Sequence, residues 1–189
     1  MEMNGSREVP GDVETTWRAL NDPEVLKACI PGCESIERIS DNEFRVVMTS
    51  RVGPVSARFN GRIVLSDVVA PTSYTLSFDG QGGAAGFAKG ETRVKLVAQN
   101  SGTRIEYTAK AQVGGKLAQI GSRLVDGAAA KVADDFFARF VEHVAAARGI
   151  EIAPPPAAKA YPFIGSMPVR LGLAAAILVA MLLYWWLQR

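Results

Sequence analysis

A stripe of apolar residues with a helical period runs through the region from Gly114 to about Arg148. The apolar residues recur at spacings of three and four, and the charged residues fall mostly between them. The stripe comprises Leu117, Ile120, Leu124, Ala128, Val132, Phe136, Phe140 and Val144. This spacing predicts one long helix with an apolar face for a hydrophobic core and a polar face for solvent.

In the region before this helix, the hydrophobic residues alternate with polar ones instead. Alternation of this kind is typical of antiparallel strands that have one apolar face and one solvated face. Short breaks that contain glycine, proline or asparagine divide the region, as consecutive antiparallel strands require. The predicted strands cover about 33–40, 42–51, 54–69, 73–80, 89–99 and 102–113. This order predicts a curved antiparallel sheet that wraps around the long helix.

The start of the chain predicts an opening strand and two short helices. Residues 1–8 form the strand, and a turn with the sequence Pro-Gly-Asp ends it. Asp12 is a candidate cap for a helix over 13–20, and Asp22-Pro23 begins a second short helix that ends before a turn at 30–32. Together with the sheet and the closing helix, these elements predict an α+β fold.

Composition indicates one folded domain with an appendage. Of the 189 residues, 48% are hydrophobic and 21% are charged, so residues 1–149 can bury a core. The 21 basic residues are interspersed with 19 acidic ones, and no basic stripe with interleaved aromatic residues occurs. We therefore expect no nucleic-acid partner. The N-terminal segment lacks a basic region followed by an apolar run, so we expect no secretory signal and a cytoplasmic location for the domain.

The C-terminal part of the chain predicts a linker and a membrane anchor. Residues 150–169 include three consecutive prolines, which cannot continue a helix and form a semi-rigid spacer. Residues 170–189 contain an uncharged apolar run from Leu171 to Leu187, followed only by Gln188 and a final arginine. Such a run is long enough for a short transmembrane helix. We predict a single-pass anchor in the cytoplasmic membrane, with a hydrophobic helix packed in an oligomer as the alternative.

The sequence offers little for catalysis or for binding a metal. The single histidine, His143, lies late in the predicted long helix, where a cation suits the helix dipole. Cys29 and Cys33 are too few ligands for a zinc site, and a reducing compartment disfavours a structural disulfide between them. No nucleophile elbow and no phosphate-binding loop occurs. We expect no catalytic residue, no metal site and no covalently bound cofactor.

A glycine-rich segment over 81–90 separates two of the predicted strands and contains one aromatic residue, Phe87. One interpretation is a mobile flap whose Phe87 lies over the mouth of a cavity or dips into lipid. A hairpin with a tucked phenylalanine fits the same residues equally well.

Three segments resemble the family of the carbon monoxide dehydrogenase G subunit, within the START/Bet v 1-like superfamily. They are Leu26–Gly32 with its Ile-Pro-Gly turn, Gly82–Gly90, and Gly114–Leu124. The resemblance covers about residues 1–147 and implies a helix-grip fold. It also implies an accessory protein that attaches a molybdenum-containing carbon monoxide dehydrogenase to the cytoplasmic membrane and serves electron transfer to the quinone pool. The apolar tail resembles the membrane extension of some family members.

On this basis we expect a non-enzymatic binding protein whose cavity takes a non-covalently bound quinone. Aromatic side chains and methionine suit a flat, isoprenylated ligand. The Tyr107 hydroxyl can donate a hydrogen bond to a quinone carbonyl. The candidate ligand-binding residues are Phe44, Met48, Phe59, Phe78, Phe87, Tyr107, Leu117, Ile120 and Leu124. Ordinary core packing is the alternative role for each of them.

Three other functions stay open at this point. A purely structural membrane-recruitment adaptor needs no cavity. A general lipid carrier binds acyl chains as readily as quinones. A cyclase or hydrolase with the same fold needs polar groups inside the cavity, and the inward-facing positions of the predicted strands offer almost none.

Overall fold

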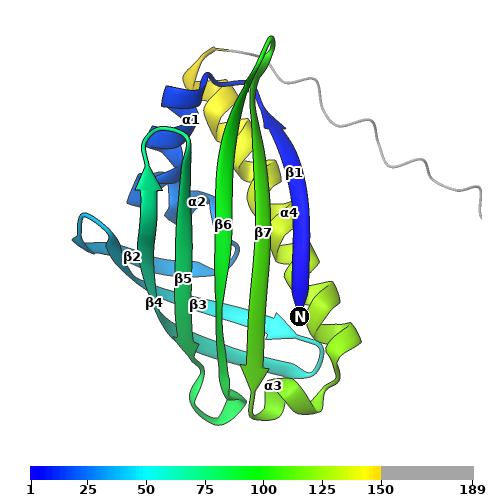
Figure 1. Ribbon diagram of the computed structural model, residues 1–189. Helices are drawn as coiled ribbons and strands as arrows, with labels where there is room; N and C mark the ends of the chain where they lie inside the picture. Colours follow the sequence, from blue (N-terminus) through cyan, green and yellow to red (C-terminus); the bar gives the residue numbers. More distant parts are fainter. Residues whose placement is uncertain (150–189) are drawn as a thin grey trace, which may run out of the picture. The chain divides into compact units, whose positions relative to one another are not determined.

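A computed structural model describes residues 1–149, and the predicted linker 150–169 and anchor 170–189 lie outside the described residues (Figure 1). The chain begins with strand β1 (Glu2–Val9) and two short helices, α1 (Val13–Leu20) and α2 (Pro23–Cys29). The Asp12 carboxylate caps α1 by accepting a hydrogen bond from the Thr15 amide at 2.7 Å. Asp22 caps α2 through the Glu24 amide at 2.9 Å. The predicted start of the fold is therefore confirmed.

The alternating region folds into six consecutive strands close to their predicted limits. They are β2 (Cys33–Ser40), β3 (Glu43–Val52), β4 (Val55–Val69), β5 (Ser73–Gln81), β6 (Phe87–Gln99) and β7 (Gly102–Gly114). With β1 they form one seven-stranded antiparallel sheet in the order β1-β7-β6-β5-β4-β3-β2. The first strand of the chain therefore pairs with the last.

The prediction of one continuous helix from Gly114 was wrong at its beginning. A short helix α3 (Lys116–Gln119) comes first, and α4 (Ser122–Ala147) follows after a break at Gly121. Gly121 has φ of 92° and ψ of 145°, a conformation that no helical residue adopts and that favours glycine. The apolar spacing continues through this glycine, so the hydrophobic pattern alone does not reveal the break.

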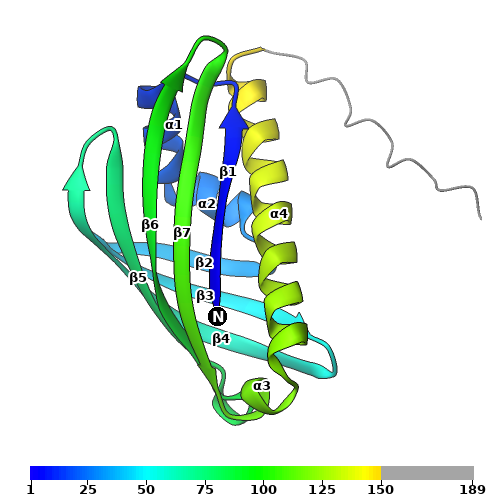
Figure 2. The ribbon, with the colours of Figure 1, turned by 45° about the vertical axis from the view of Figure 1, so that its right-hand side comes forward.

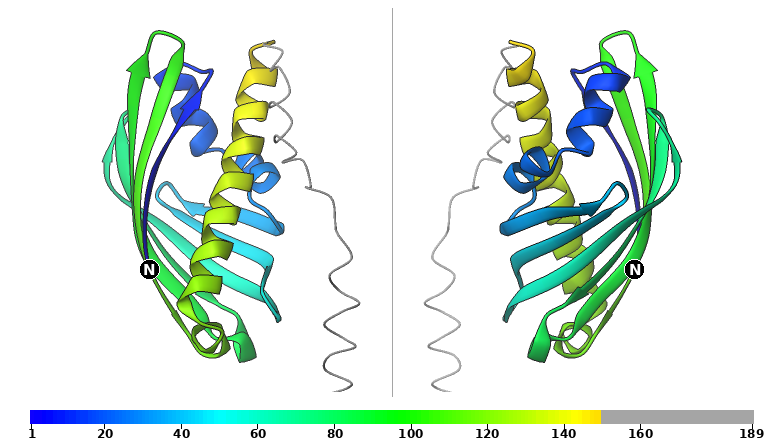
Figure 3. Two further views of the ribbon diagram at one scale, coloured as in Figure 1. Left: turned by 90° about the vertical axis from the view of Figure 1, so that its right-hand side faces the viewer. Right: turned by 90° about the vertical axis from the view of Figure 1, so that its left-hand side faces the viewer.

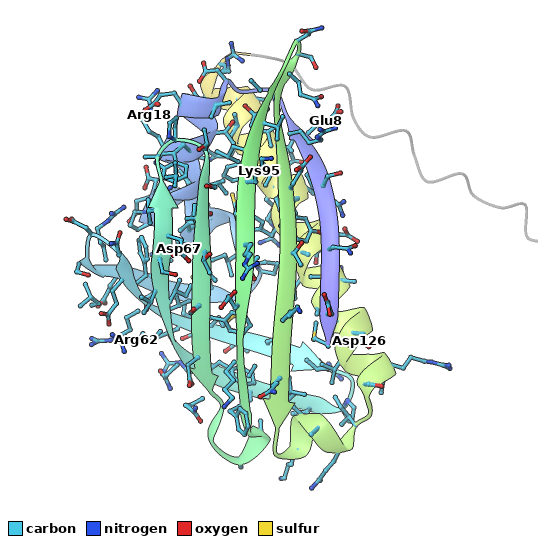
Figure 4. All side chains as sticks on the ribbon, viewed as in Figure 1. Glu8, Arg18, Arg62, Asp67, Lys95 and Asp126 are labelled. Atoms are coloured by element: carbon cyan, nitrogen blue, oxygen red, sulfur yellow. The ribbon has the colours of Figure 1, made fainter. Side chains whose placement is uncertain are left out.

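The sheet curves around α4, which runs along its open side (Figures 2 and 3). We call the side of the sheet that faces the helices the concave face and the opposite side the convex face. The strand register pairs Phe44 with Ile63 and Ile63 with Phe78, which places these side chains together on the concave face. Charged side chains such as Asp67 and Lys95 extend from the convex face (Figure 4).

Two hydrophobic clusters on the concave face form the core. The first joins α1, α2 and the C-terminal half of α4 to β1, β6 and β7, with Phe140 fully buried. The second lies on β2 to β5 around Phe44 and Tyr74. The Trp17 ring links the two clusters and meets the Tyr74 ring edge-on at 5.5 Å between centroids. Within residues 1–149, no helix is both long and apolar enough to cross a membrane.

Candidate functional site

Small residues form the middle of the concave face. One row across the sheet runs from Val46 through Gly61, Gly80 and Ala88 to Val113. The neighbouring row contains Phe78 next to two further small residues. We call the group Gly61, Gly80, Ala88, Gly90 and Ala111 the small-residue surface. Because none of its members extends beyond Cβ, the sheet leaves room at Gly61 and Gly80 on the side that faces α4, whereas the Phe78 ring covers Gly90.

The middle of α4 is also built from small apolar residues and is not fully packed. Ala128, Ala129, Val132 and Ala133 are all partly exposed, and no residue within 126–139 is fully buried. By contrast, Phe140 further along the same helix has no exposed surface. The described part of the concave face thus has a closed core where α1, α2 and the C-terminal half of α4 meet, and a partly exposed apolar region elsewhere.

The inward-facing positions of β3 to β7 carry no charged side chain. Their polar groups are limited to hydroxyls, among them those of Ser50, Thr92 and Tyr107. Burial raises the pKa of the Tyr74 hydroxyl, so this group stays neutral at any physiological pH. Within residues 1–149 no group of three or more His, Cys, Asp or Glu side chains is arranged to hold a metal ion. The surface is suited to an apolar molecule rather than an ionic one.

Three of the predicted ligand-binding residues lie beside the small-residue surface and keep partial exposure. Met48 and Phe59 face each other on adjacent strands, and Phe78 lies one strand further along. The Phe59 ring occupies the space beside Gly82, where an added Cβ would collide with it. The Phe78 ring lies over Gly90 in the same way, at 2.9 Å from an added Cβ. The structure therefore brings these three side chains to the partly exposed apolar region.

Tyr107 and Phe44 are on the same face but in different surroundings. The Tyr107 ring stacks on Phe137 of α4, with 5.2 Å between centroids, and its hydroxyl lies against Gly5. Phe44 is only 2% exposed and belongs to the second core cluster, with the Arg38 guanidinium over its ring. Tyr107 remains accessible to a ligand in part, whereas Phe44 packs in the core.

The remaining predicted ligand-binding residues lie at the far end of the sheet. Leu117 of α3 is buried, Ile120 is partly exposed, and Leu124 at the start of α4 is 51% exposed. Phe87 lies on the convex face, where its ring covers Gly114 and Lys89 Nζ lies 5.7 Å from the ring centroid. The structure does not bring Phe87 to the concave face, where the five other predicted strand residues lie. The role of all nine in binding stays a prediction.

The small-residue surface and Phe137 are the parts of this region that sequence reasoning missed. The expected lining residues were all large apolar side chains, and glycine has no side chain. A signal does exist, because Gly61, Gly80 and Gly90 occupy positions where the alternation calls for an inward apolar residue. Glycine at such positions indicates space on the inward face or close approach of another group.

A hollow with a volume of about 660 Å³ lies on the convex face. Asp67, Arg93, Lys95 and Glu106 are among the residues that line it, and Figure 4 shows Asp67 and Lys95 on this side of the sheet. Opposite charges alternate across it, so it resembles an ordinary solvated sheet surface more than an apolar binding site.

Comparisons with known proteins agree with this geometry. The model of the family described as the G subunit of carbon monoxide dehydrogenase (CoxG) matches residues 5–145. A conserved protein from Geobacillus kaustophilus with a solved structure is 34% identical to this chain. The match covers 78% of this chain and 97% of that chain, with a TM-score of 0.73.

Two more distant solved structures share the fold alone. A protein from Thermus thermophilus is 19% identical over 78% of this chain and 99% of its own, with a TM-score of 0.60. A START superfamily protein from Mycobacterium smegmatis is 14% identical over 77% and 98%, also with a TM-score of 0.60. The comparison with curated proteins finds no match. With its helix-grip fold and the family match over most of residues 1–149, the chain belongs to the CoxG family, that of the carbon monoxide dehydrogenase G subunit.

Proposed function

We propose that this protein is a non-enzymatic accessory protein of a molybdenum-containing carbon monoxide dehydrogenase, and that its concave face holds a quinone. The partly exposed, uncharged small-residue surface is the observation that carries the proposal. The family match supports the association with the enzyme. In this proposal the protein recruits the enzyme to the cytoplasmic membrane and links it to the quinone pool.

The concave face leaves apolar surface exposed to water, and this favours an apolar ligand. Each Å² of apolar surface that a ligand removes from water contributes about 25 cal/mol. Met48, Phe59 and Phe78 offer dispersion contacts to a flat ring, and Gly61 and Gly80, which no side chain covers, let that ring approach the sheet. The Tyr107 hydroxyl would donate a hydrogen bond to a quinone carbonyl. These features favour a planar ring with carbonyl groups over a simple acyl chain.

The predicted anchor completes the proposal. A quinone is dissolved in the bilayer, so a domain tethered to the membrane through residues 150–189 can collect it there and present it to the enzyme. Residues 170–189 lie outside the described residues, and their role as an anchor is part of the proposal.

The test is native mass spectrometry with solvent extraction of residues 1–153, purified without detergent from a host that makes quinones. Gly80→Leu is the informative variant. A Cβ at Gly80 would meet the Ala88 carbonyl at 3.6 Å, an ordinary contact, and the rest of the leucine would project over the small-residue surface. Ser77→Leu is the matched control, because it places the same side chain on the convex face of the same strand.

We expect the wild type and Ser77→Leu to carry quinone, and Gly80→Leu to lose roughly tenfold in occupancy, which corresponds to about 1.4 kcal/mol of binding free energy. A stable wild-type domain that carries nothing would contradict the proposal and favour a structural recruitment adaptor. A bound phospholipid in place of quinone would instead favour a general lipid carrier.

A further inference from the structure

Three segments that are far apart in the sequence meet at one end of the described domain (Figures 1 and 2). They are the β3–β4 hairpin (51–58), the loop between β5 and β6 with its flanks (80–90), and the stretch around α3 (114–125). A Cβ added to Gly53 in the hairpin would meet Leu124 Cδ1 at 3.6 Å. One added to Gly115 would meet Gly86 Cα at 2.6 Å, so the loop packs tightly on the segment before α3.

Every charged residue within these limits is basic, and the acidic Asp79, Glu91 and Asp126 each lie one residue beyond them. The basic residues are Arg51, Arg58, Lys89, Lys116 and Arg123. With the three flanking acidic residues counted, this end has five basic and three acidic residues, so it holds an excess of positive charge as large as that of the whole chain, which has 21 basic and 19 acidic residues. Among residues 1–149, only Arg58 of the five has an acidic ion-pair partner, Glu34. We call this region the basic end.

The basic end also exposes apolar groups. Leu124 is 51% exposed, Pro54 at the tip of the hairpin is exposed, and Ile120 is partly exposed. A single exposed leucine on a protein surface is ordinary. Here, however, the apolar groups are flanked by Arg51 and Arg123, and this combination suits a lipid surface. Apolar side chains enter the headgroup region while lysine and arginine contact anionic headgroups.

We propose that the basic end docks on the surface of an anionic bilayer, independently of residues 150–189. The proposal rests on the proposed function, because it supplies the orientation in which the concave face would collect its ligand. Leu124 and Pro54 enter the headgroup region, and Arg51, Lys116 and Arg123 meet the lipid phosphates. The small-residue surface then lies next to the membrane, since Gly80 and Gly90 flank the loop between β5 and β6 at this same end.

Co-sedimentation of residues 1–153 with lipid vesicles tests the docking without the apolar tail. The Geobacillus kaustophilus protein consists almost entirely of this domain and folds, so the domain is expected to fold alone. We expect binding to vesicles of phosphatidylcholine mixed with phosphatidylglycerol, weak binding to phosphatidylcholine alone, and loss of binding at high salt. The charge reversals R51E, K116E and R123E together should weaken binding by more than about tenfold, since each basic residue near the surface is worth roughly fivefold.

The matched control reverses Arg45, Lys95 and Arg139, which are exposed, lie outside the basic end and have no ion-pair partner among residues 1–149. This variant has the same net charge as the first and should keep binding within about twofold of the wild type, because charges beyond a Debye length of the surface contribute little. Equal losses in both variants, or a basic-end variant that binds as well as the wild type, would overturn the docking proposal. A far-ultraviolet circular dichroism spectrum of each variant confirms that it is folded.

Ligand content measured by extraction from the same preparations separates the two proposals. A domain that carries quinone but does not bind anionic vesicles would refute the docking surface and would not contradict the proposed function. A domain that binds anionic vesicles through the basic end but carries no ligand would refute the proposed function alone.

Discussion

At the scale of single residues, the contrast between Phe140 and Leu124 shows where the fold gains its stability. Both belong to the same apolar stripe of the sequence, yet Phe140 has no exposed surface and Leu124 is 51% exposed. Phe140 stacks on Phe136 with 5.7 Å between ring centroids and packs in the first core cluster. Helical spacing identifies which residues share a face, but the position along the helix decides which of them are buried.

We therefore predict very different costs for truncating these two side chains. Phe140→Ala should lower the free energy of unfolding of residues 1–153 by about 3–5 kcal/mol, because it leaves a cavity in a closed core. Leu124→Ala should change it by less than about 0.5 kcal/mol. Urea denaturation followed by circular dichroism measures both. Similar values for the two variants would mean that Leu124 is buried in solution.

At the scale of elements, the break between α3 and α4 depends on backbone conformation more than on packing. An added Cβ at Gly121 would meet nothing within 4 Å, and the same holds at Gly127 within α4. The two glycines differ in that only Gly121 has positive φ, at 92°. Replacing each of them with alanine therefore distinguishes the effect of backbone strain from the effect of steric crowding.

Replacing each of these glycines with alanine should shift stability in opposite directions. Gly121→Ala should destabilise the domain by about 1–3 kcal/mol, the typical cost of a residue other than glycine in this conformation. Gly127→Ala should stabilise it by about 0.5–1 kcal/mol through helix propensity and the reduced freedom of the unfolded chain. Thermal unfolding of the two variants and the wild type measures both changes in stability. Stabilisation by both substitutions would indicate that α3 and α4 form one continuous helix in solution.

At the scale of the whole molecule, three carboxyl groups make the stability of the fold depend on pH. A hydrogen bond from the Arg62 side chain lowers the pKa of Glu43 below its ordinary value of 4.5. Hydrogen bonds from Thr49 and Arg58 lower the pKa of Glu34, and the Thr15 amide lowers that of Asp12 below 3.8. Because these pKa values are lower in the folded chain, the unfolded chain takes up protons first on acidification. The stability that they contribute is complete above the ordinary values and is lost as pH falls through the folded ones.

We expect the urea concentration at which half of the protein (residues 1–153) is unfolded to fall as pH decreases below about 4.5, the ordinary pKa of glutamate. Glu43→Gln should make this acid-induced decrease smaller, because it removes one of the groups that titrate. Glu37→Gln is the matched control, since Glu37 is exposed and forms no ion pair within residues 1–149. Urea midpoints at several pH values report the difference, and an equal pH dependence in both variants would contradict this assignment.

Most of the fold could be predicted from the sequence because its strands alternate cleanly and its short helices have aspartate caps. The inward direction of Phe44, Phe59 and Phe78 follows from that alternation and was confirmed. The side of the sheet that Phe87 occupies was missed because the predicted strand began at 89, whereas β6 begins at Phe87 and the alternation of Val94 and Leu96, continued back, places Phe87 on the convex face. The small-residue surface was missed because the expected lining residues were large apolar side chains, although glycine at the inward positions 61, 80 and 90 does mark it.

The pairing of the first strand with the last has a consequence for synthesis of the chain. Glu2 pairs with Lys110 and Val9 with Thr103, so β1 has no sheet partner until β7 has been made. At about 5–20 residues per second, a ribosome needs roughly 5–20 s for that stretch. During this interval the nascent β1 is an unpaired strand that ends in the apolar Val9, and Phe140 has not yet been added to close the core around it. The domain therefore completes its fold only near the end of its own translation, and its first strand waits longer for a partner than any other strand of the sheet.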